Sequence, residues 1–250
     1  TTYDYRGTGA SRRGRLRGFE ADLLTWARHD YDTVLRAAKA LHPGRPLYVV
    51  GHSLGGQLPG LLPDPSLIDG MVTVGAGSGY WRDNAPPLKR KVWLFWWLAV
   101  PLATRAFGYF PGRRIGMVGD LPTGVVRQWG RWCHDPDYCV GVEPGAREAF
   151  ARVRFPVSML TFTDDEFMTE RGCRALMGFY VNAPKHFERI APAEAGAARI
   201  GHFGFFRPRF EAVWLLAVAP IVATMIGTGM NHFWHAPSAN HGGDLVYFQG

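Results

Sequence analysis

One serine lies in the setting that nucleophilic catalysis requires. Ser53 is the centre of G-H-S-L-G, directly after the strand-forming run LYVV and before a predicted helix. A serine hydroxyl is a weak nucleophile unless a base removes its proton and nearby donors stabilise the oxyanion. A sharp strand-to-helix turn supplies that geometry: Gly51 and Gly55 leave room for the chain to fold back, and the Leu54 amide can serve as an oxyanion donor. Alone, the pentapeptide fits a glycine-rich turn equally well, so partners must be found elsewhere.

An orienting acid is expected after a later strand. The run VSMLTF, residues 157–162, continues into Thr163, Asp164, Asp165 and Glu166. A carboxylate at this point can orient a histidine ring and stabilise the imidazolium, although the N-terminus of a helix would show the same residues. We predict Asp165 as the acid, with Asp164 as the alternative.

The general base is expected last. Of nine histidines, most lie on the first helix, at the elbow or in the C-terminal tail, which leaves His134, His186 and His202. Only His202 lies in a glycine-flanked loop beyond the acid, in RIGHFGFFR. We therefore predict His202 as the base, ahead of His186.

The elements that would position these residues alternate between strands and helices. Apolar runs of strand length cover residues 47–50, 71–74 and 157–162, and KHFERIAP contains a further strand signal. Residues 19–41 carry apolar side chains at helical spacing. Strands that alternate with helices predict an α/β protein with a parallel sheet that is buried on both faces.

The segment 84–150 interrupts this rhythm and is too long for an ordinary connection. It is rich in Trp, Phe, Pro and Arg, and we interpret it as an inserted cap. Its large apolar side chains could line a substrate pocket or form the core of the cap itself. The residues predicted to contact substrate are Trp93, Trp96, Trp97 and Phe107.

Four motifs of the chain resemble those of bacterial α/β-hydrolases of the esterase and lipase kind. DYRGTGAS resembles the loop after the fourth strand of that fold, GHSLGGQ its nucleophile elbow, TFTDDEF its acid loop and GHFGFFR its histidine loop. The order of nucleophile, acid and base is also that of the family. The resemblance covers roughly residues 3–216 and implies an α/β-hydrolase fold, with a mostly parallel sheet and helices on both faces.

The resemblance also implies a division of the chain. Residues 1–83 and 151–230 would form the core, 84–150 the cap, and 231–250 a tail that partly resembles an engineered protease site. Three strands that precede the DYRGTG loop in the family are absent, which predicts a truncated chain with a gap beside the nucleophile strand. The loop after the third strand usually carries a second oxyanion donor, and loss of one donor costs about 2.7 to 4 kcal/mol.

The function expected from these residues is hydrolysis of carboxylic esters, with an apolar acyl group, through an acyl-enzyme on Ser53. No cofactor or metal is required. Two alternatives stay open because fold does not settle function. The same residues could serve an acyltransferase or thioesterase, or the fold could carry a non-catalytic binding or membrane-peripheral protein.

The expected partner is a small-molecule ester, and the charge pattern argues against a nucleic-acid partner. The chain has 28 Lys and Arg against 21 Asp and Glu, but the dense basic run SRRGRLRG lacks the interleaved aromatics of a single-strand binder, which argues against nucleic acid. Cys133, Cys139 and Cys173 fit packed side chains better than a disulfide or zinc framework. With no export signal at the N-terminus, a cytoplasmic location is expected. The sequence specifies no oligomeric state.

Two apolar runs raise the question of membrane association. Residues 92–103 are too few to span a bilayer, and Pro101 interrupts them. Residues 212–230 come closer to the required length. We favour a C-terminal helix packed on the sheet, with membrane attachment as the alternative.

Overall fold

A five-stranded sheet forms the centre of the molecule. The computed structural model describes residues 1–116, 119–211, 213–214 and 244–248. The main sheet has the order β6-β5-β2-β1-β7, and every neighbouring pair is parallel. The strands are β1 (Leu47–His52), β2 (Gly70–Val74), β5 (Val157–Phe162), β6 (Lys185–Ile190) and β7 (Asp244–Phe248). The predicted α/β fold with a parallel sheet is confirmed.

The middle strands are buried on both faces. Every residue of β2 and β5 is buried, as expected for continuous apolar strands between two layers of helices. Because the strands are parallel, their carboxyl ends meet at one edge, where Val74 pairs with both His52 and Leu160. The residues that follow β1, β2 and β5 are therefore brought side by side.

The strand beside β1 comes from the C-terminal segment. Residues 244–248 pair in parallel with β1, so that Asp244 lies opposite Leu47 and Phe248 opposite Gly51. We expected residues 231–250 to stay outside the fold and a gap to remain on this flank. The structure corrects that expectation, because β7 occupies the flank. The run DLVYF is rich in β-branched and aromatic residues, so a strand signal was present in the sequence.

The first long helix begins later than its apolar pattern predicts. α1 (Leu23–Thr25), the π-helical segment η2 (Trp26–Tyr31) and α2 (Asp32–Leu41) form one continuous helix. The Asp22 side chain accepts a hydrogen bond from the Thr25 amide at 2.7 Å and so caps the first turn. Residues 19–22, which we expected to be helical, lie outside the helix, with Asp22 as its capping residue.

Shorter elements complete the fold, all of them in the core except η7 in the cap. The helix α3 (Leu54–Gln57) follows β1, and α9 (Glu170–Phe179) follows the acid loop. Turns of 3-10 helix are η1 (Gly9–Ser11), η3 (Leu58–Leu61), η4 (Pro65–Leu67), η5 (Trp81–Asp83), η7 (Gly112–Ile115), η8 (Pro192–Ala195) and η9 (Pro208–Phe210).

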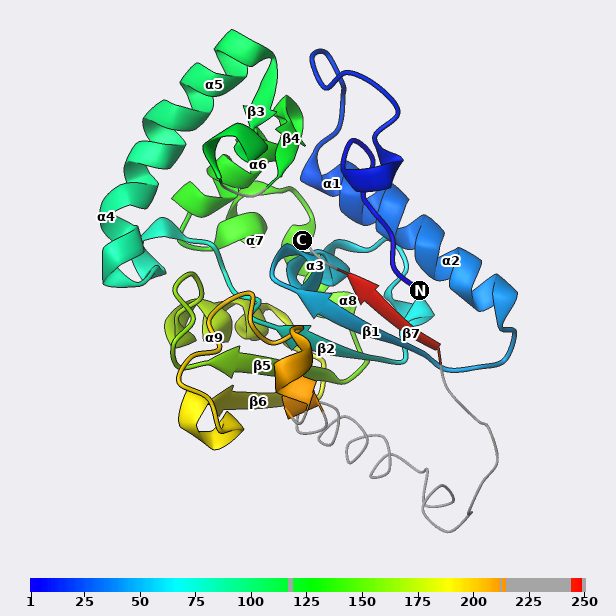
Figure 1. Cartoon of the computed structure of the whole chain (residues 1–250). Helices are drawn as coiled ribbons and strands as arrows, with labels where there is room; N and C mark the ends of the chain where they lie inside the picture. Colours follow the sequence, from blue (N-terminus) through cyan, green and yellow to red (C-terminus); the bar gives the residue numbers. More distant parts are fainter. Residues whose placement is uncertain (117–118, 212, 215–243, 249–250) are drawn as a thin grey trace.

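Most of the segment between β2 and β5 forms a second layer beyond the carboxyl edge of the sheet, and its last helix, α8, lies back beside the core (Figure 1). The segment consists of α4 (Pro86–Leu94), the π-helical η6 (Phe95–Ala99), α5 (Val100–Phe107), the antiparallel strands β3 (Tyr109–Pro111) and β4 (Asp120–Pro122), α6 (Thr123–His134), α7 (Tyr138–Val142) and α8 (Ala146–Arg152). In α8 the Phe150 ring lies 4.9 Å from that of Tyr180. The expected boundary at residue 150 therefore falls inside a helix that packs on the core.

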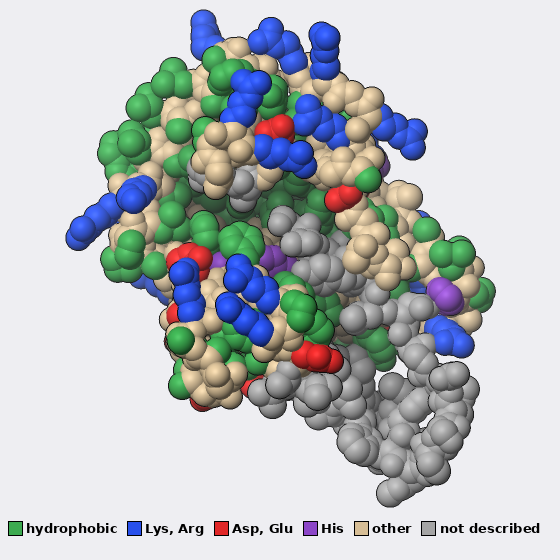
Figure 2. Space-filling model, viewed as in Figure 1, with side chains coloured by type: hydrophobic (Ala, Val, Ile, Leu, Met, Phe, Trp, Pro, Cys, Tyr) green, Lys and Arg blue, Asp and Glu red, His purple; other side chains and the backbone are tan. Residues whose placement is uncertain are grey.

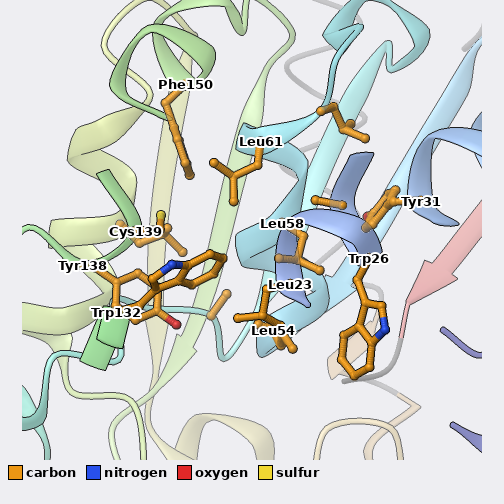
Figure 3. Packing of buried hydrophobic residues seen from close by; sticks show 14 of the residues in the cluster. Leu23, Trp26, Tyr31, Leu54, Leu58, Leu61, Trp132, Tyr138, Cys139 and Phe150 are labelled. Atoms are coloured by element: carbon orange, nitrogen blue, oxygen red, sulfur yellow. The ribbon is translucent and has the colours of Figure 1, made fainter. Parts of the chain in front are cut away.

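One hydrophobic cluster runs through both layers. Trp132 and Tyr138 of the cap belong to the same cluster as Leu23, Leu54 and Leu58 of the core, and Figure 3 shows these side chains together. The cap is therefore not separated from the sheet by a solvated gap at this point.

A buried polar network also joins the cap to the first helix. Gln128 Oε1 accepts a hydrogen bond from the Leu23 amide at 2.5 Å, and its Nε2 donates to Glu143 at 3.0 Å. Trp132 Nε1 donates to the same carboxylate at 2.7 Å. Buried polar groups are costly unless they are hydrogen-bonded, so this network specifies how α6 sits against α1.

The structure describes only one of the two apolar runs that raised the question of membrane association. Residues 92–103 lie within the continuous helix 86–107, which is buried along one face. Residues 212–230 fall outside the described residues, apart from 213 and 214. Among the residues that the structure describes, no helix combines the length and the apolar character needed to cross a membrane.

Candidate active site

Ser53 lies at the tip of a sharp turn between β1 and α3. Its φ of 49° and ψ of −119° fall in a region that residues with side chains rarely adopt, at a cost of order 1–3 kcal/mol. The Ser53 amide donates to the Val74 carbonyl at 3.0 Å, and the Gly56 amide donates to the Ser53 carbonyl at 3.0 Å. The strained turn is therefore held from both sides, in the strand-turn-helix setting that the motif requires.

Two glycines allow the chain to fold back here. A Cβ atom on Gly51 would lie 2.5 Å from the Gly55 carbonyl oxygen, and one on Gly56 would lie 2.8 Å from Ala76 Cβ. Both separations are too short for non-bonded atoms. Sequence analysis assigned this role to Gly51 and Gly55, and the structure adds Gly56, which lies outside the pentapeptide.

His202 and Asp165 form a buried side-chain pair. His202 Nδ1 lies 2.8 Å from Asp165 Oδ2, and both side chains are buried. The other oxygen, Asp165 Oδ1, accepts the amides of Phe167 and Met168, each at 2.8 Å. A carboxylate anchored in this way favours the proton on Nδ1, which leaves Nε2 as the acceptor. The ring contacts Asp165 and not the alternative, Asp164.

The neighbouring acids bind the backbone of the histidine loop. Asp164 Oδ2 accepts the amides of Ile200 and Gly201 at 2.9 and 3.0 Å. Glu166 Oε2 accepts the His202 amide at 3.0 Å. Three consecutive carboxylates therefore contact three different parts of one loop, and only the middle one reaches the imidazole.

His52 is a positioning residue that sequence analysis missed. Its Nε2 lies 2.9 Å from the carbonyl oxygen of His202, and the two ring centroids are 4.8 Å apart. Burial, and to a lesser degree His202, lowers the pKa of His52 to about 4. The ring is therefore neutral at pH 7 and donates its Nε2 proton to that carbonyl. The two residues are 150 positions apart, so the contact could not be predicted from a local sequence pattern.

Gly75 lies directly beside the His202–Asp165 pair. Its φ is +56°, and a Cβ atom there would lie 3.2 Å from Asp165 Oδ2 and 3.4 Å from His202 Nδ1. The Gly75 amide donates to the Leu160 carbonyl at 2.9 Å. Sequence analysis could have identified Gly75 from its position immediately after a buried strand, at the carboxyl edge of the sheet.

Ser53 and His202 face a common space. Both line one cavity of about 800 Å³, together with Leu54. The Leu54 amide is the first of α3, and the first amides of a helix have no acceptor within it. The Ser53 hydroxyl makes no hydrogen bond with any of the described residues. Catalytic hydrogen bonds are often long until substrate binds.

The cavity lies between the two layers, and Figure 2 shows the hollow with histidine atoms inside it. Its volume is in the range of small-molecule sites, roughly 300–1,000 Å³. The apolar part of the lining comprises Trp26, Leu54, Leu121, Val125, Trp129, Phe167, Met168 and Phe203. The acid and histidine loops thus supply apolar walls as well as polar groups.

Trp129, one of the residues that line the cavity, is connected through Tyr138 to α3, the helix that follows Ser53. Trp129 Nε1 donates to the Tyr138 hydroxyl at 3.0 Å, and that hydroxyl donates to Gln57 Oε1 at 2.8 Å. Tyr138 adopts a φ of 53°, which is uncommon for a residue with a side chain. The relay Trp129–Tyr138–Gln57 therefore links the roof of the cavity to α3, the helix that begins after Ser53.

The residues predicted to contact substrate do not line this cavity: Trp93, Trp96, Trp97 and Phe107. Trp96 is buried within the cap, where its ring lies 5.5 Å from that of Trp129. Trp93 and Trp97 are each 48% exposed. The structure corrects the prediction, because composition identified an aromatic cap but did not reveal which face of each helix turns inward. Trp129, one of the other cap aromatics, lines the cavity instead.

The alternative bases lie elsewhere. His186 is on the edge strand β6, with Nε2 3.6 Å from Glu188. The His134 ring stacks on Trp97 at 3.7 Å between centroids. Neither residue lines the cavity.

Metal and thiol chemistry find no support in the described part of the chain. There, no group of three or more His, Cys, Asp or Glu side chains could hold a metal ion. The three cysteines are free and buried, and burial raises the pKa of Cys173 to about 12. Such a thiol stays protonated at neutral pH and is a poor nucleophile.

Solved structures share this fold. The structure of Rv0554 from Mycobacterium tuberculosis aligns with a TM-score of 0.52 at 17% identity, over 89% of this chain and 77% of that one. The peroxisomal alpha-beta-hydrolase Lpx1 from Saccharomyces cerevisiae gives 0.50 at 14%, over 95% and 70%. A monoacylglycerol lipase from Paleococcus ferrophilus gives 0.48 at 15%, over 80% and 75%. At such identities the likeness concerns the fold alone.

Comparison by sequence gives the family. No curated protein matches the chain. The model of the alpha/beta hydrolase family, however, matches residues 1–235, which is well over half of the sequence. On that match, the chain belongs to the alpha/beta hydrolase family.

Proposed function

We propose that this hydrolase cleaves carboxylic esters through an acyl-enzyme formed on Ser53. The observation that carries the proposal is the 2.8 Å contact between His202 Nδ1 and Asp165, in a cavity that Ser53 also lines. The strained backbone of Ser53 adds support, because strain of this kind persists where the surroundings enforce it and clusters at active sites.

In the first half-reaction, His202 Nε2 takes the proton of the Ser53 hydroxyl while the serine oxygen attacks the ester carbonyl. Asp165 stays ionised, holds the proton on Nδ1 and stabilises the imidazolium. The tetrahedral oxyanion accepts a hydrogen bond from the Leu54 amide. The intermediate then expels the alcohol, which receives its proton from His202.

In the second half-reaction, the same groups act on water. His202 Nε2 removes a proton from a water molecule, whose oxygen attacks the acyl carbonyl to give a second tetrahedral intermediate. As this intermediate collapses, the bond between the acyl carbon and the Ser53 oxygen breaks, the serine oxygen takes the proton back from His202, and the acid is released. His52, Asp164 and Glu166 touch none of the reacting atoms in this scheme. They are positioning residues that hold the backbone of the histidine loop.

The substrate we propose carries an apolar acyl group. Support comes from the cavity that Ser53 lines, whose walls also include Leu121, Val125 and Trp129 of the cap and Phe167 and Phe203 of the acid and histidine loops. Burial of apolar surface against such walls contributes roughly 25 cal/mol per Å². Esters with a medium or long acyl chain should therefore be cleaved faster, at subsaturating concentration, than acetates.

A fluorophosphonate probe tests the nucleophile. We expect the wild-type protein to be labelled and Ser53→Ala to be unlabelled and inactive on p-nitrophenyl esters. Ser66→Ala is the matched control, because Ser66 is exposed in η4 and bonds only to Asp64. Equal labelling of wild type and Ser53→Ala would disprove the proposed nucleophile, and a wild type with neither labelling nor turnover would favour a binding protein.

A further inference from the structure

The outer face of the cap helix 86–107 is apolar and uncovered. Leu94, Leu98 and Leu102 are 46%, 49% and 57% exposed and follow one another at a spacing of four residues. Trp93 and Trp97 lie next to this row. Figure 2 shows hydrophobic side chains gathered along the edge of the molecule over α4 and α5. Single exposed apolar residues are ordinary, but contiguous patches mark interaction surfaces.

The opposite face of the same helix is fixed in the cap. Val92, Trp96, Val100 and Thr104 are buried, again at a spacing of four. The Thr104 hydroxyl also receives a hydrogen bond from Arg127 Nε at 3.3 Å. The helix cannot turn its leucine row inward without pulling this buried row out, so the row must face outward.

Cations flank the apolar row at both ends. Lys89, Arg90 and Lys91 precede it, Arg105 follows it, and residues 86–107 contain no Asp or Glu. All four cations are exposed, and none forms an ion pair with another of the described residues. A tryptophan-bearing apolar face with three cations at one end and one at the other is the pattern of a helix that lies in the plane of a membrane interface.

We propose that this face docks on the surface of an anionic lipid bilayer. Leu94, Leu98, Leu102 and Trp93 would enter the boundary between headgroups and acyl chains, while the flanking cations contact anionic headgroups. Each cation near such a surface contributes a favourable term that falls off within a Debye length. The inference is independent of the proposed esterase activity, because none of these residues lines the catalytic cavity.

Charge argues for a bilayer over a second copy of the chain. Two copies that met through this face would bring eight cations together with no carboxylate from either helix to offset them, and the whole chain already carries +7. Like charges across an interface disfavour association. An anionic surface turns the same charges into an attraction.

Vesicle flotation tests the proposal on the full-length protein. The vesicles are phosphatidylcholine alone, or phosphatidylcholine with about one third phosphatidylglycerol, a composition that isolates surface charge. We expect the wild type to float with the anionic vesicles, and to float less with neutral vesicles or at high salt. The combined variant Leu94→Gln, Leu98→Gln, Leu102→Gln should reduce the partition coefficient at least about tenfold, because three apolar anchors are lost.

Two further variants keep the test interpretable. Leu41→Gln with Val181→Gln removes apolar side chains elsewhere that are more exposed than the leucine row, 73% and 62%, and should float as the wild type does. Lys89→Gln, Arg90→Gln, Lys91→Gln keeps the apolar row and should lose most of the preference for anionic vesicles.

Several results would overturn the proposal. One is a wild type that stays at the bottom of the gradient with both vesicle types. Another is undiminished flotation of the triple leucine variant, which would place the contact on a different segment. A third is concentration-dependent self-association of the wild type that the leucine variant abolishes, without vesicle binding, since the face would then be a contact between copies. A thermal unfolding transition of the leucine variant that matches that of the wild type confirms that the variant is folded.

Discussion

The carboxyl edge of the sheet, where we propose catalysis and which we call the catalytic edge, and the outer face of the cap helix are opposite kinds of surface. At the catalytic edge, each acid of the loop 164–166 is matched to a specific amide or ring nitrogen of the histidine loop. On the outer face of the helix 86–107, large apolar side chains are about half exposed and the cations have no carboxylate partner among the described residues.

This difference separates two uses of side chains. Groups at the catalytic edge must stay within a few tenths of an ångström of one geometry, so they are held by several hydrogen bonds and by glycines that leave no room for a Cβ atom. Groups on the outer face have no such requirement within the folded chain. Substitutions should therefore be severe at the first surface and mild for folding at the second.

The largest expected effect distinguishes the members of the acid loop. Asp165→Asn should lower kcat on the order of 10⁴-fold, because the amide no longer favours the required tautomer of His202. Asp164→Asn keeps an oxygen that can accept from the Ile200 or Gly201 amide, and should cost about tenfold. Steady-state kinetics on one ester measure both. Equal losses would mean that Asp165 acts only on the position of the loop.

The next effect is a pH dependence of stability that comes from His52. Because its folded pKa lies near 4, below the usual 6.5, the unfolded chain binds the proton more readily. The contribution of neutral His52 to the free energy of unfolding is therefore complete above pH 6.5 and is lost as the pH falls toward 4. The total loss is about 3 kcal/mol. We expect His52→Gln, which retains a donor for the His202 carbonyl, to lose this part of the pH dependence.

Urea unfolding of wild type and His52→Gln at the two ends of that pH range measures the difference. Other histidines contribute to both proteins and cancel in the comparison. Identical pH profiles would show that His52 is solvated, and would weaken the contrast between a fully matched catalytic edge and a tolerant cap surface.

A smaller effect is expected from a methyl group at Gly75, and a matched variant at Gly44 separates steric crowding of Asp165 and His202 from backbone strain. Gly75→Ala should destabilise the fold by about 2 kcal/mol and also lower kcat, because the new methyl group meets Asp165 and His202 at a positive φ. Gly44→Ala is the control, with a φ of +77° and nothing within 4 Å. It should cost about 1 kcal/mol from strain alone and leave kcat unchanged. A loss of kcat in both variants would remove the special role of Gly75. Thermal unfolding and kinetics supply the two readouts.

The smallest effect is expected on the cap. Leu102→Gln, at a position 57% exposed, should change the free energy of unfolding by less than about 0.5 kcal/mol. Urea unfolding in the absence of lipid is the measurement. A loss several times larger would mean that the leucine row is packed in solution, and the comparison of the two surfaces would fail.

Much of the catalytic edge was predictable because its signals are local. β1, β2 and β5 are continuous apolar runs with turn residues after them, and Ser53 lies in a short motif whose spacing reflects the turn itself. Asp165 and His202, which the structure places 2.8 Å apart and whose catalytic roles we propose, were selected by their order in the chain and by the loops around them. The choice of Asp165 over Asp164 was a weaker inference. The two residues are adjacent, and sequence does not show which side chain points toward the imidazole.

The remainder depended on contacts that sequence does not encode locally. The cap aromatics have the composition of a pocket, yet Trp93 and Trp97 face outward because the helix buries a different row. The bond between His52 and His202 joins distant segments. The segment 244–248 has the residues of a strand, but its pairing with β1 is a property of the whole sheet.

The relay of Trp129, Tyr138 and Gln57 has a consequence for how substrate enters. To lift the cap as a hinged lid, the protein would have to break the buried hydrogen bond from Tyr138 to Gln57 and that from the Leu23 amide to Gln128, and open an apolar cluster shared by both layers. Entry of substrate with the cap in place involves no such disruption. We therefore expect the rate of turnover to depend on the size of the ester and not on a movement of the cap.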